Sequence, residues 1–138
     1  MRHCCFIGET MRKILIIEDE PEIRLILAMA LQHSGEFEPI LAADGVEGIE
    51  MARKGSPDVI LIDIVMPRLD GYATCRQIKE CSALKDIPVI FLTAKTDRNE
   101  IDRAIKAGAC GYLHKPFDPL KLAGQIEAIV TGATPNDV

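Results

Sequence analysis

Short apolar runs alternate along the chain with longer segments in which apolar and polar residues mix. The runs are rich in Ile, Leu and Val and are bounded by charged or turn-forming residues. A run that is apolar on both faces is typical of a buried strand in a parallel sheet. The pattern predicts five strands, over Lys13–Ile17, Phe37–Ala42, Asp58–Ile62, Ile87–Leu92 and Cys110–His114.

The segments between these runs carry helix signals. Pro21 follows three acidic residues, which favours a helix start, and Ser34-Gly35 ends that helix. The apolar residues that share one face of this first helix, and that we expect in the core, are Ile23, Ile26, Leu27, Ala30 and Leu31. Four more helices are predicted, over Gly45–Lys54, Tyr72–Cys81, Asp97–Ala107 and from a cap at Asp118-Pro119 to about Val130.

Strands that alternate with helices predict a parallel sheet, because parallel neighbours need a crossover connection. Right-handed crossovers place helices on both faces and give a doubly wound α/β sheet. In such folds, ligands bind beyond the carboxyl ends of the strands. The residues that follow each strand are therefore the first candidates for a functional site.

The composition narrows the classes of protein that fit. A chain of 138 residues suits one domain with a single core. A formal net charge of −5 disfavours direct binding to nucleic acid or to an anionic membrane surface, since both need clustered basic residues. No apolar run approaches the roughly 20 residues that span a bilayer, and the first ten residues do not form a signal peptide. We therefore expect a cytoplasmic protein.

The cysteines do not predict a disulfide framework or a zinc site. Their number, 5, is odd, Cys4 and Cys5 are adjacent, and no CxxC pair occurs. We expect all of them to be reduced and non-catalytic.

Charged and hydroxyl side chains follow four of the five predicted strands. They are Glu18 and Asp19 after the first strand, Asp63 after the third, Thr93 after the fourth and Lys115 after the fifth. Crowded carboxylates repel one another unless a cation intervenes, and Mg²⁺ prefers a few hard oxygen ligands together with water and phosphate. A carboxylate can also attack phosphorus and form an aspartyl phosphate. This strand edge therefore predicts phosphoryl chemistry assisted by a metal ion.

The segments ILIIEDE, DVILIDIVMPRLDG, PVIFLTAK and GAxGYLHKPF carry these residues in that order. Together they resemble the response-regulator receiver domain of two-component signalling, over about residues 12–130. The resemblance implies a flavodoxin-like, doubly wound five-stranded parallel sheet with strand order 2-1-3-4-5. We expect a stand-alone receiver domain over residues 12–131, after an N-terminal extension at 1–11 and before a C-terminal tail at 132–138.

The resemblance also implies how the phosphoryl group is held. Asp63 corresponds to the phosphoacceptor, and Thr93 to the hydroxyl that bonds a phosphate oxygen. Lys115 corresponds to the lysine that pairs first with the acceptor and then with the phosphate. Its bond to Pro116 is cis in the family, and an X-Pro bond is the peptide bond that tolerates this isomer.

A metal site and a switch follow from the same resemblance. Mg²⁺, or Mn²⁺ in its place, is expected on the carboxylates of Asp19 and Asp63, on Glu18 through water, and on the backbone carbonyl of Val65. Tyr112 corresponds to the aromatic switch residue, which turns inward as the strand-end threonine moves toward phosphate.

Two positions tune hydrolysis of the phosphoryl group in this family, and here they are Val65 and Lys95. Because Val65 cannot hold an attacking water by a hydrogen bond, we expect slow self-dephosphorylation. The only chemistry expected is therefore phosphoryl transfer to Asp63, catalysed by the domain itself, and this slow loss; the chain is not expected to be an enzyme on other substrates.

The implied partners are proteins. The donor is a sensor histidine kinase or a histidine phosphotransfer protein, and a downstream target binds the face made by the fourth helix, the fifth strand and the fifth helix. We expect no direct contact with nucleic acid or membrane, and a monomer or a weak, phosphorylation-dependent dimer.

Other functions remain open at this point. The chain could be an interaction module that works without phosphorylation, although the acceptor, the threonine and the lysine are all present. It could be the receiver fragment of a larger regulator. A phosphatase with an aspartate nucleophile usually has a second Asp where Val65 stands, and a nucleotide-binding protein would show a phosphate-binding glycine loop, which is missing.

Overall fold

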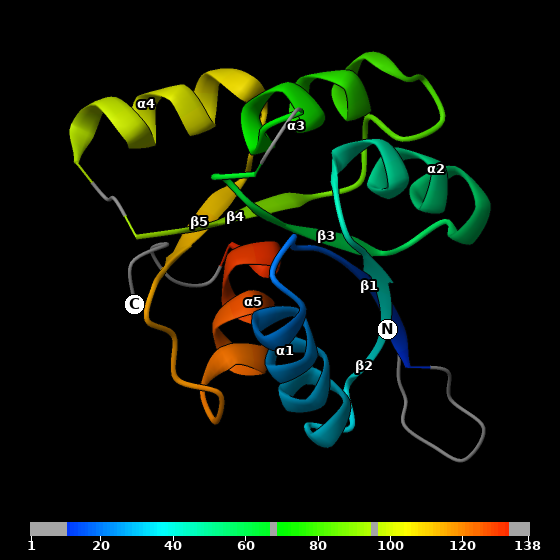
Figure 1. Cartoon of the computed structure of the whole chain (residues 1–138), viewed down its shortest axis with the longest axis vertical. Helices are drawn as coiled ribbons and strands as arrows, with labels where there is room; N and C mark the ends of the chain where they lie inside the picture. The colour runs from blue at the N-terminus through cyan, green and yellow to red at the C-terminus, as the bar shows by residue number, and fades with distance from the viewer. Residues whose placement is uncertain (1–10, 67–68, 95–96, 133–138) are drawn as a thin grey trace.

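Five parallel strands form a single sheet in the order β2-β1-β3-β4-β5 (Figure 1). The structure is a computed structural model that describes residues 11–66, 69–94 and 97–132. The strands are β1 (Arg12–Ile17), β2 (Phe37–Ala42), β3 (Val59–Asp63), β4 (Val89–Thr93) and β5 (Gly111–His114). The predicted α/β fold and strand order are confirmed. The order reverses at β1 and β3, and this switch point is where such sheets bind their ligands.

Helices cover both faces of the sheet. They are α1 (Pro21–His33), α2 (Gly45–Gly55), α3 (Gly71–Glu80), α4 (Arg98–Ala107) and α5 (Leu122–Thr131). Figure 1 shows α1 and α5 on one face and α2, α3 and α4 on the other. None of the helices in the described part of the chain is long and apolar enough to cross a membrane.

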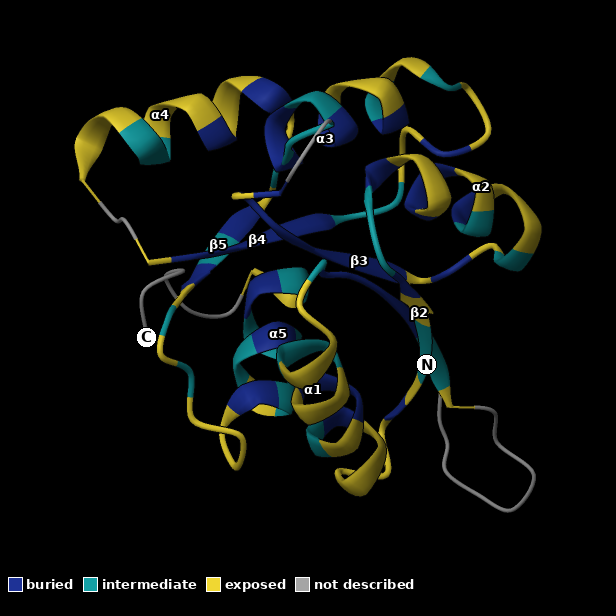
Figure 2. Cartoon of the chain, viewed as in Figure 1, coloured by how far each residue is buried: buried dark blue, intermediate teal, exposed yellow. Residues whose placement is uncertain are grey.

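Successive residues of the central strands belong to two separate cores, one on each side of the sheet. Figure 2 shows these strands largely buried between the two layers of helices. On β1, Ile14 and Ile16 belong to the core under α1 and α5, whereas Leu15 and Ile17 belong to the core under α2, α3 and α4. All four side chains are 0% exposed. Complete burial of such a side chain stabilises the fold by about 1.5–3 kcal/mol, which favours Ile and Leu at these four positions.

Aspartates cap the three helices of the second face. The side chains of Asp44, Asp70 and Asp97 each accept a hydrogen bond from the backbone N–H three residues further on. Each cap satisfies a backbone donor that the helix itself cannot, which is worth about 1 kcal/mol. Asp70 thereby fixes where α3 begins, close to the end of β3.

The last helix begins later than predicted. The Asp118 side chain accepts a hydrogen bond from the N–H of Leu120 at 3.0 Å, and its carbonyl accepts one from the N–H of Lys121 at 3.0 Å. These bonds close a separate turn, so α5 begins only at Leu122. The prediction that Asp118-Pro119 caps the helix was therefore wrong: Asp118 caps the turn instead.

The buried face of α1 is the predicted one except at Ile26. Leu27, Ala28 and Leu31 are buried, whereas Ile26 is 43% exposed. Ile23 and Ala30 pack against the same core, whereas Leu25 and Met29 are exposed like Ile26. The spacing of apolar residues therefore identified the side that meets the sheet but extended it too far at Ile26.

Candidate functional site

The acidic pair follows β1 directly. The N–H of Glu18 donates to the carbonyl of Ala42 at 3.1 Å, which keeps the residue beside β2. Its carboxylate accepts from the N–H of Glu20 at 3.2 Å, and the guanidinium of Arg24 donates to its carbonyl at 2.7 Å. The Glu18 side chain is fully buried, whereas Asp19 is half-buried. The carboxylate of Glu18 is thus shielded from solvent, whereas that of Asp19 is partly accessible to it.

Asp63 is the last residue of β3 and is 5% exposed. After it, the N–H of Ile64 donates to the carbonyl of Leu92, and the N–H of Gly71 donates to the carbonyl of Ile64 at 2.9 Å. A Cβ atom on Gly71 would lie 2.7 Å from the carbonyl oxygen of Asp63. A residue without a side chain is therefore needed for α3 to begin this close to Asp63.

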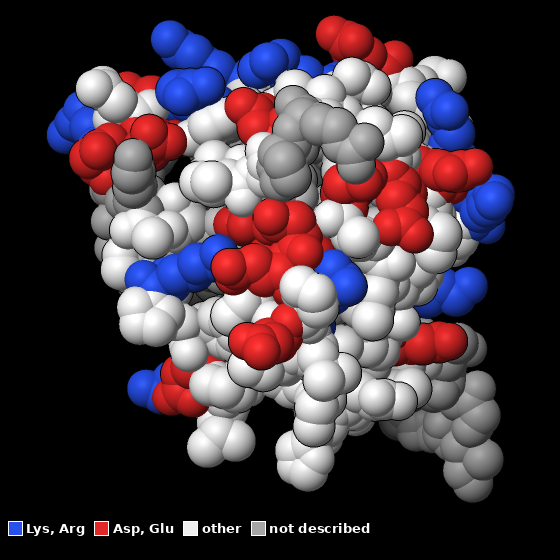
Figure 3. All heavy atoms as spheres, in the orientation of Figure 1, with Lys and Arg blue, Asp and Glu red and all other residues white. Residues whose placement is uncertain are grey.

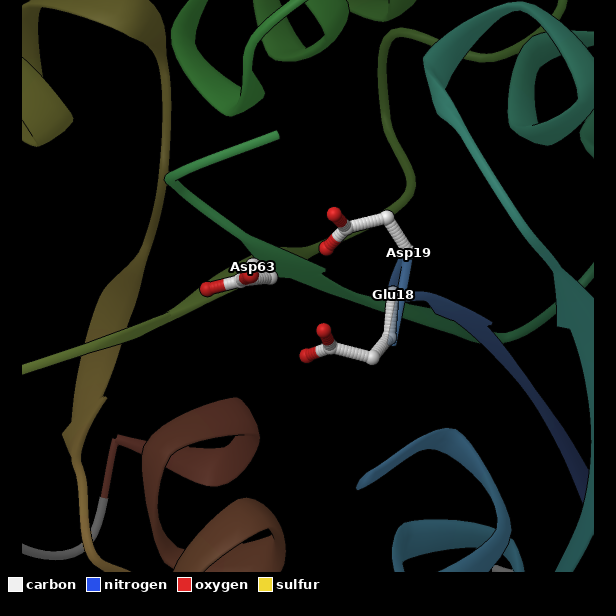
Figure 4. Close-up of side chains that lie close together, drawn as sticks. All are labelled: Glu18, Asp19 and Asp63. Atoms are coloured by element: carbon white, nitrogen blue, oxygen red, sulfur yellow. The ribbon is translucent and has the colours of Figure 1, made fainter. Parts of the chain in front are cut away.

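Three carboxylates meet at this edge of the sheet. Glu18, Asp19 and Asp63 each offer one oxygen, and these oxygens lie within 4.8 Å of one another (Figure 4). We call these three residues the acidic cluster. In the space-filling view, Asp and Glu side chains gather near the middle of this face of the molecule (Figure 3).

Lys115 brings a positive charge to the acidic cluster. Its Nζ atom donates a hydrogen bond to Oδ1 of Asp63 at 3.0 Å and lies 3.9 Å from Oε1 of Glu18. Its backbone N–H donates to the carbonyl of Thr93 at 2.7 Å, which ties the end of β5 to the end of β4. The Lys115–Pro116 bond is cis, as the resemblance implied.

One lysine does not offset the charge of the acidic cluster. Burial, followed by the negative charge of Asp63, raises the pKa of Glu18 to about 7, against the opposing effects of the Glu20 N–H and Lys115. Oε1 of Glu18 is buried and has no hydrogen-bond partner. A buried charged oxygen without a partner is unfavourable, so the site gains stability from any further positive charge placed there.

The acidic cluster fits a small, hard divalent cation such as Mg²⁺. Its donors are carboxylate oxygens, and the Glu18 carboxylate carries a buried oxygen, Oε1, that has no hydrogen-bond partner. Mg²⁺ takes few carboxylates and keeps several waters, which suits a site that is open on one side at the half-buried Asp19.

The other predicted residues lie around this site. Thr93 is the last residue of β4 and is buried, and Val65 follows β3 with a side chain that is 76% exposed. Tyr112 is half-buried on β5, opposite Phe91 of β4. The roles assigned to these residues in phosphate binding, tuning and switching stay predictions. Lys95, the second tuning position, lies outside the described residues.

Two residues of this region were missed in the sequence. Arg24 donates a hydrogen bond to the backbone carbonyl of Glu18. The sequence feature that could have indicated this contact is a basic residue one turn into the helix that follows the acidic pair. Tyr72 was taken only as the start of a helix. It is 3% exposed and its hydroxyl bonds to α4, a contact between distant segments that no local pattern indicates.

The fold and the site define a doubly wound α/β protein with an acidic cluster and a paired lysine at the carboxyl edge of its sheet. A family model described as the response regulator receiver domain matches residues 14–127. The chain therefore belongs to the response regulator receiver domain family. It is the receiver domain of a two-component response regulator.

Relatives support this assignment. The chain is 40% identical over 122 residues to the probable transcriptional regulator ycf27 of Guillardia theta. The aligned region covers 88% of this chain and 46% of that relative. The chain is 38% identical over 125 residues to the response regulator MprA of Mycobacterium leprae, covering 91% and 54%. The chain thus spans about half the length of these curated relatives. The solved structure of the chemotaxis protein CheY4 of Vibrio cholerae matches with a TM-score of 0.83 and 32% identity, covering 87% of this chain and 99% of that one.

Proposed function

We propose that this receiver domain is a phosphorelay switch in which Asp63 accepts the phosphoryl group of a phosphohistidine. The donor is a sensor histidine kinase or a histidine phosphotransfer protein. One observation carries the proposal: Asp63 lies within the acidic cluster and 3.0 Å from the ammonium of Lys115. A carboxylate nucleophile, a fixed ammonium and ligands for a cation are the parts that phosphoryl transfer to an aspartate needs.

The transfer is a displacement at phosphorus. A carboxylate oxygen of Asp63 attacks in line with the P–N bond of the phosphohistidine. The P–O bond forms as the P–N bond breaks, and the electron pair leaves on the imidazole nitrogen. Lys115 then donates to an oxygen of the transferred group, while the hydroxyl of Thr93 donates to another. Both donors stabilise negative charge on the phosphoryl oxygens.

The metal site serves the same step. Asp19, Asp63 and the carbonyl of Val65 would hold Mg²⁺ directly, with Glu18 acting through water. When bound, the ion supplies the positive charge that lets an anionic carboxylate approach an anionic phosphoryl group. Mn²⁺ has the same preference for oxygen ligands and would substitute.

The output is a change of conformation. Phosphate on Asp63 biases two conformations of the domain, which differ chiefly at the face formed by α4, β5 and α5. Tyr112 turns inward as Thr93 moves toward the phosphate, and a downstream protein binds this face. We expect a monomer or a weak dimer that depends on phosphorylation, and no reaction on a separate substrate. If the chain is part of a longer regulator, an attached output domain takes the place of the downstream protein.

The test uses acetyl phosphate as the donor. The protein is incubated with acetyl phosphate and Mg²⁺, and its intact mass is measured beside the variants Asp63→Asn and Asp102→Asn. Asp102 is an exposed carboxylate on α4, so the second variant controls for the loss of one negative charge. We expect a gain of one phosphoryl group in the wild type and in Asp102→Asn, and none in Asp63→Asn or without Mg²⁺.

Two results would overturn the proposal. A gain that persists in Asp63→Asn would place the acceptor elsewhere. No gain in the wild type, either from acetyl phosphate or from a panel of phosphorylated histidine phosphotransfer domains, would show a site that does not accept phosphate.

A further inference from the structure

Tyr72 lies in the first turn of α3 and is held in place by close packing. Its side chain is 3% exposed, and its ring meets the ring of Phe91 edge to face, with centroids 5.4 Å apart. The preceding residue, Gly71, packs against the backbone of Asp63 and Ile64 so closely that a Cβ atom would not fit. The backbone that carries Tyr72 therefore has little freedom to move relative to the phosphoacceptor.

From this position Tyr72 reaches across to α4. Its hydroxyl donates a hydrogen bond to the carboxylate of Glu100 and lies 3.3 Å from the carbonyl oxygen of the same residue. The guanidinium of Arg103 lies over the ring, 4.1 Å from its centre. A buried hydroxyl needs a partner, and a cation over an aromatic face is attractive, so both contacts favour the observed place of α4. We call these three residues the α4 latch.

The rest of α4 is weakly packed. Only Ala104 and Ala107 of this helix are buried, and both are small. A pocket of about 370 Å³ lies between α4 and the segments that follow β3 and β4. Its lining includes Tyr72, Thr93, Glu100 and Arg103. A helix that buries little apolar area and borders an open pocket depends strongly on its few polar contacts.

We propose that Tyr72 is a positioning residue that, through Glu100 and Arg103, holds α4 against α3 in the unphosphorylated domain. Thr93 lines the same pocket as the α4 latch and ends the strand that leads into α4. Opening the latch therefore frees Thr93 to move toward a phosphoryl group on Asp63. This consequence for signalling rests on the proposed function, whereas the role of Tyr72 in holding α4 against α3 does not.

The test compares Tyr72→Phe with the wild type. This variant keeps the ring, its contact with Phe91 and the cation above it, and removes only the hydroxyl. We expect the amide protons of α4 to exchange with deuterium about fivefold to tenfold faster in the unphosphorylated protein, the effect of losing one hydrogen bond to a carboxylate. Amides of β1 and β3 should keep their protection. Phosphoryl uptake from acetyl phosphate should become about fivefold faster.

Two variants at Glu100 and one control sharpen the test. Glu100→Gln retains an oxygen that can accept from the hydroxyl, so it should behave nearly as the wild type does, whereas Glu100→Ala should match Tyr72→Phe. Combining Glu100→Ala with Tyr72→Phe should add little, since both remove the same contact. Asp102→Asn removes a charge from the same helix without touching the latch and should leave the exchange of α4 unchanged.

The outcomes separate the two claims. Unchanged exchange of α4 in Tyr72→Phe overturns the latch. Faster exchange with unchanged phosphoryl uptake overturns its link to Thr93. If the wild type takes up no phosphoryl group, the proposed function fails, and the exchange of α4 in the same samples still decides whether Tyr72 holds this helix.

Discussion

Glu18 shows how a single buried carboxyl group ties the stability of the domain to pH. In the unfolded chain it titrates near 4.5, and in the folded metal-free protein burial and the neighbouring Asp63 raise its pKa to about 7. Between these values the folded protein holds a proton that the unfolded chain has released. Stability must therefore fall as the pH rises through this window, and the loss is complete above it.

We expect Glu18→Gln to flatten this pH dependence. The amide is close in size to the carboxyl group but does not ionise, so the variant should lose less stability than the wild type between about pH 4.5 and 7. The measurement is the urea midpoint of both proteins in EDTA across this range. Saturating Mg²⁺ should flatten the wild-type profile as well. An equally steep profile in Glu18→Gln would assign the effect to other groups.

Val65 offers a second test at the scale of one residue. Its side chain is 76% exposed beside Asp63 and cannot form a hydrogen bond. We expect Val65→Asn to speed the loss of phosphate from Asp63 by about tenfold, since an amide can orient the attacking water. Decay of the phosphorylated mass after removal of the donor measures this rate. Val65→Ile serves as the apolar control, and a faster decay in it would point to steric effects instead.

At the scale of elements, the close approach of α3 to β3 should be the least tolerant contact of the site. A Cβ atom on Gly71 would meet backbone atoms of Asp63 and Ile64 at 2.7 Å, and backbone cannot move aside as a flexible side chain can. We expect Gly71→Ala to cost about 1–3 kcal/mol of unfolding free energy and to weaken Mg²⁺ binding. Denaturant unfolding and calorimetry measure the two effects.

Gly124 on α5 provides the matched control. Nothing lies within 4 Å of a Cβ atom at this position, which is helical and exposed. Gly124→Ala should therefore leave Mg²⁺ binding unchanged and stabilise the protein by up to about 1 kcal/mol. Equal losses in both alanine variants would contradict the steric account of Gly71.

Elements whose local sequence favours only one type of structure were predicted well. The strands β1, β3 and β4 are apolar on both faces. The parallel sheet brings Asp63, at the end of β3, close to Lys115, which follows β5, as expected. The prediction failed where two local signals compete. Asp118 could cap a helix or a turn, and its hydrogen bonds from the N–H groups of Leu120 and Lys121 close the turn. The contact of Tyr72 with Glu100 depends on how α3 and α4 pack, which local sequence does not encode.

For the whole molecule, the metal site should couple cation binding to folding. Its proposed carboxylate ligands follow β1 and end β3, so they are far apart in the sequence and the unfolded chain has no comparable site. A ligand that binds only the folded state at one hundred times its Kd stabilises it by about 2.7 kcal/mol. We expect Mg²⁺ to raise the urea midpoint at pH 7 accordingly. Asp19→Asn should lose most of this gain, and an equal gain in that variant would show that the ion acts elsewhere.

The residues of the site are also distributed across the sheet. Glu18 and Asp19 follow β1, Asp63 and Thr93 end β3 and β4, and Lys115 follows β5. A slip of any one of these strands by a residue separates the acceptor from its lysine or from the acidic pair. A misassembled copy of the domain therefore has no means of taking up phosphate. Correct strand pairing is therefore a condition for phosphorylation, so only a correctly folded domain can transmit the signal.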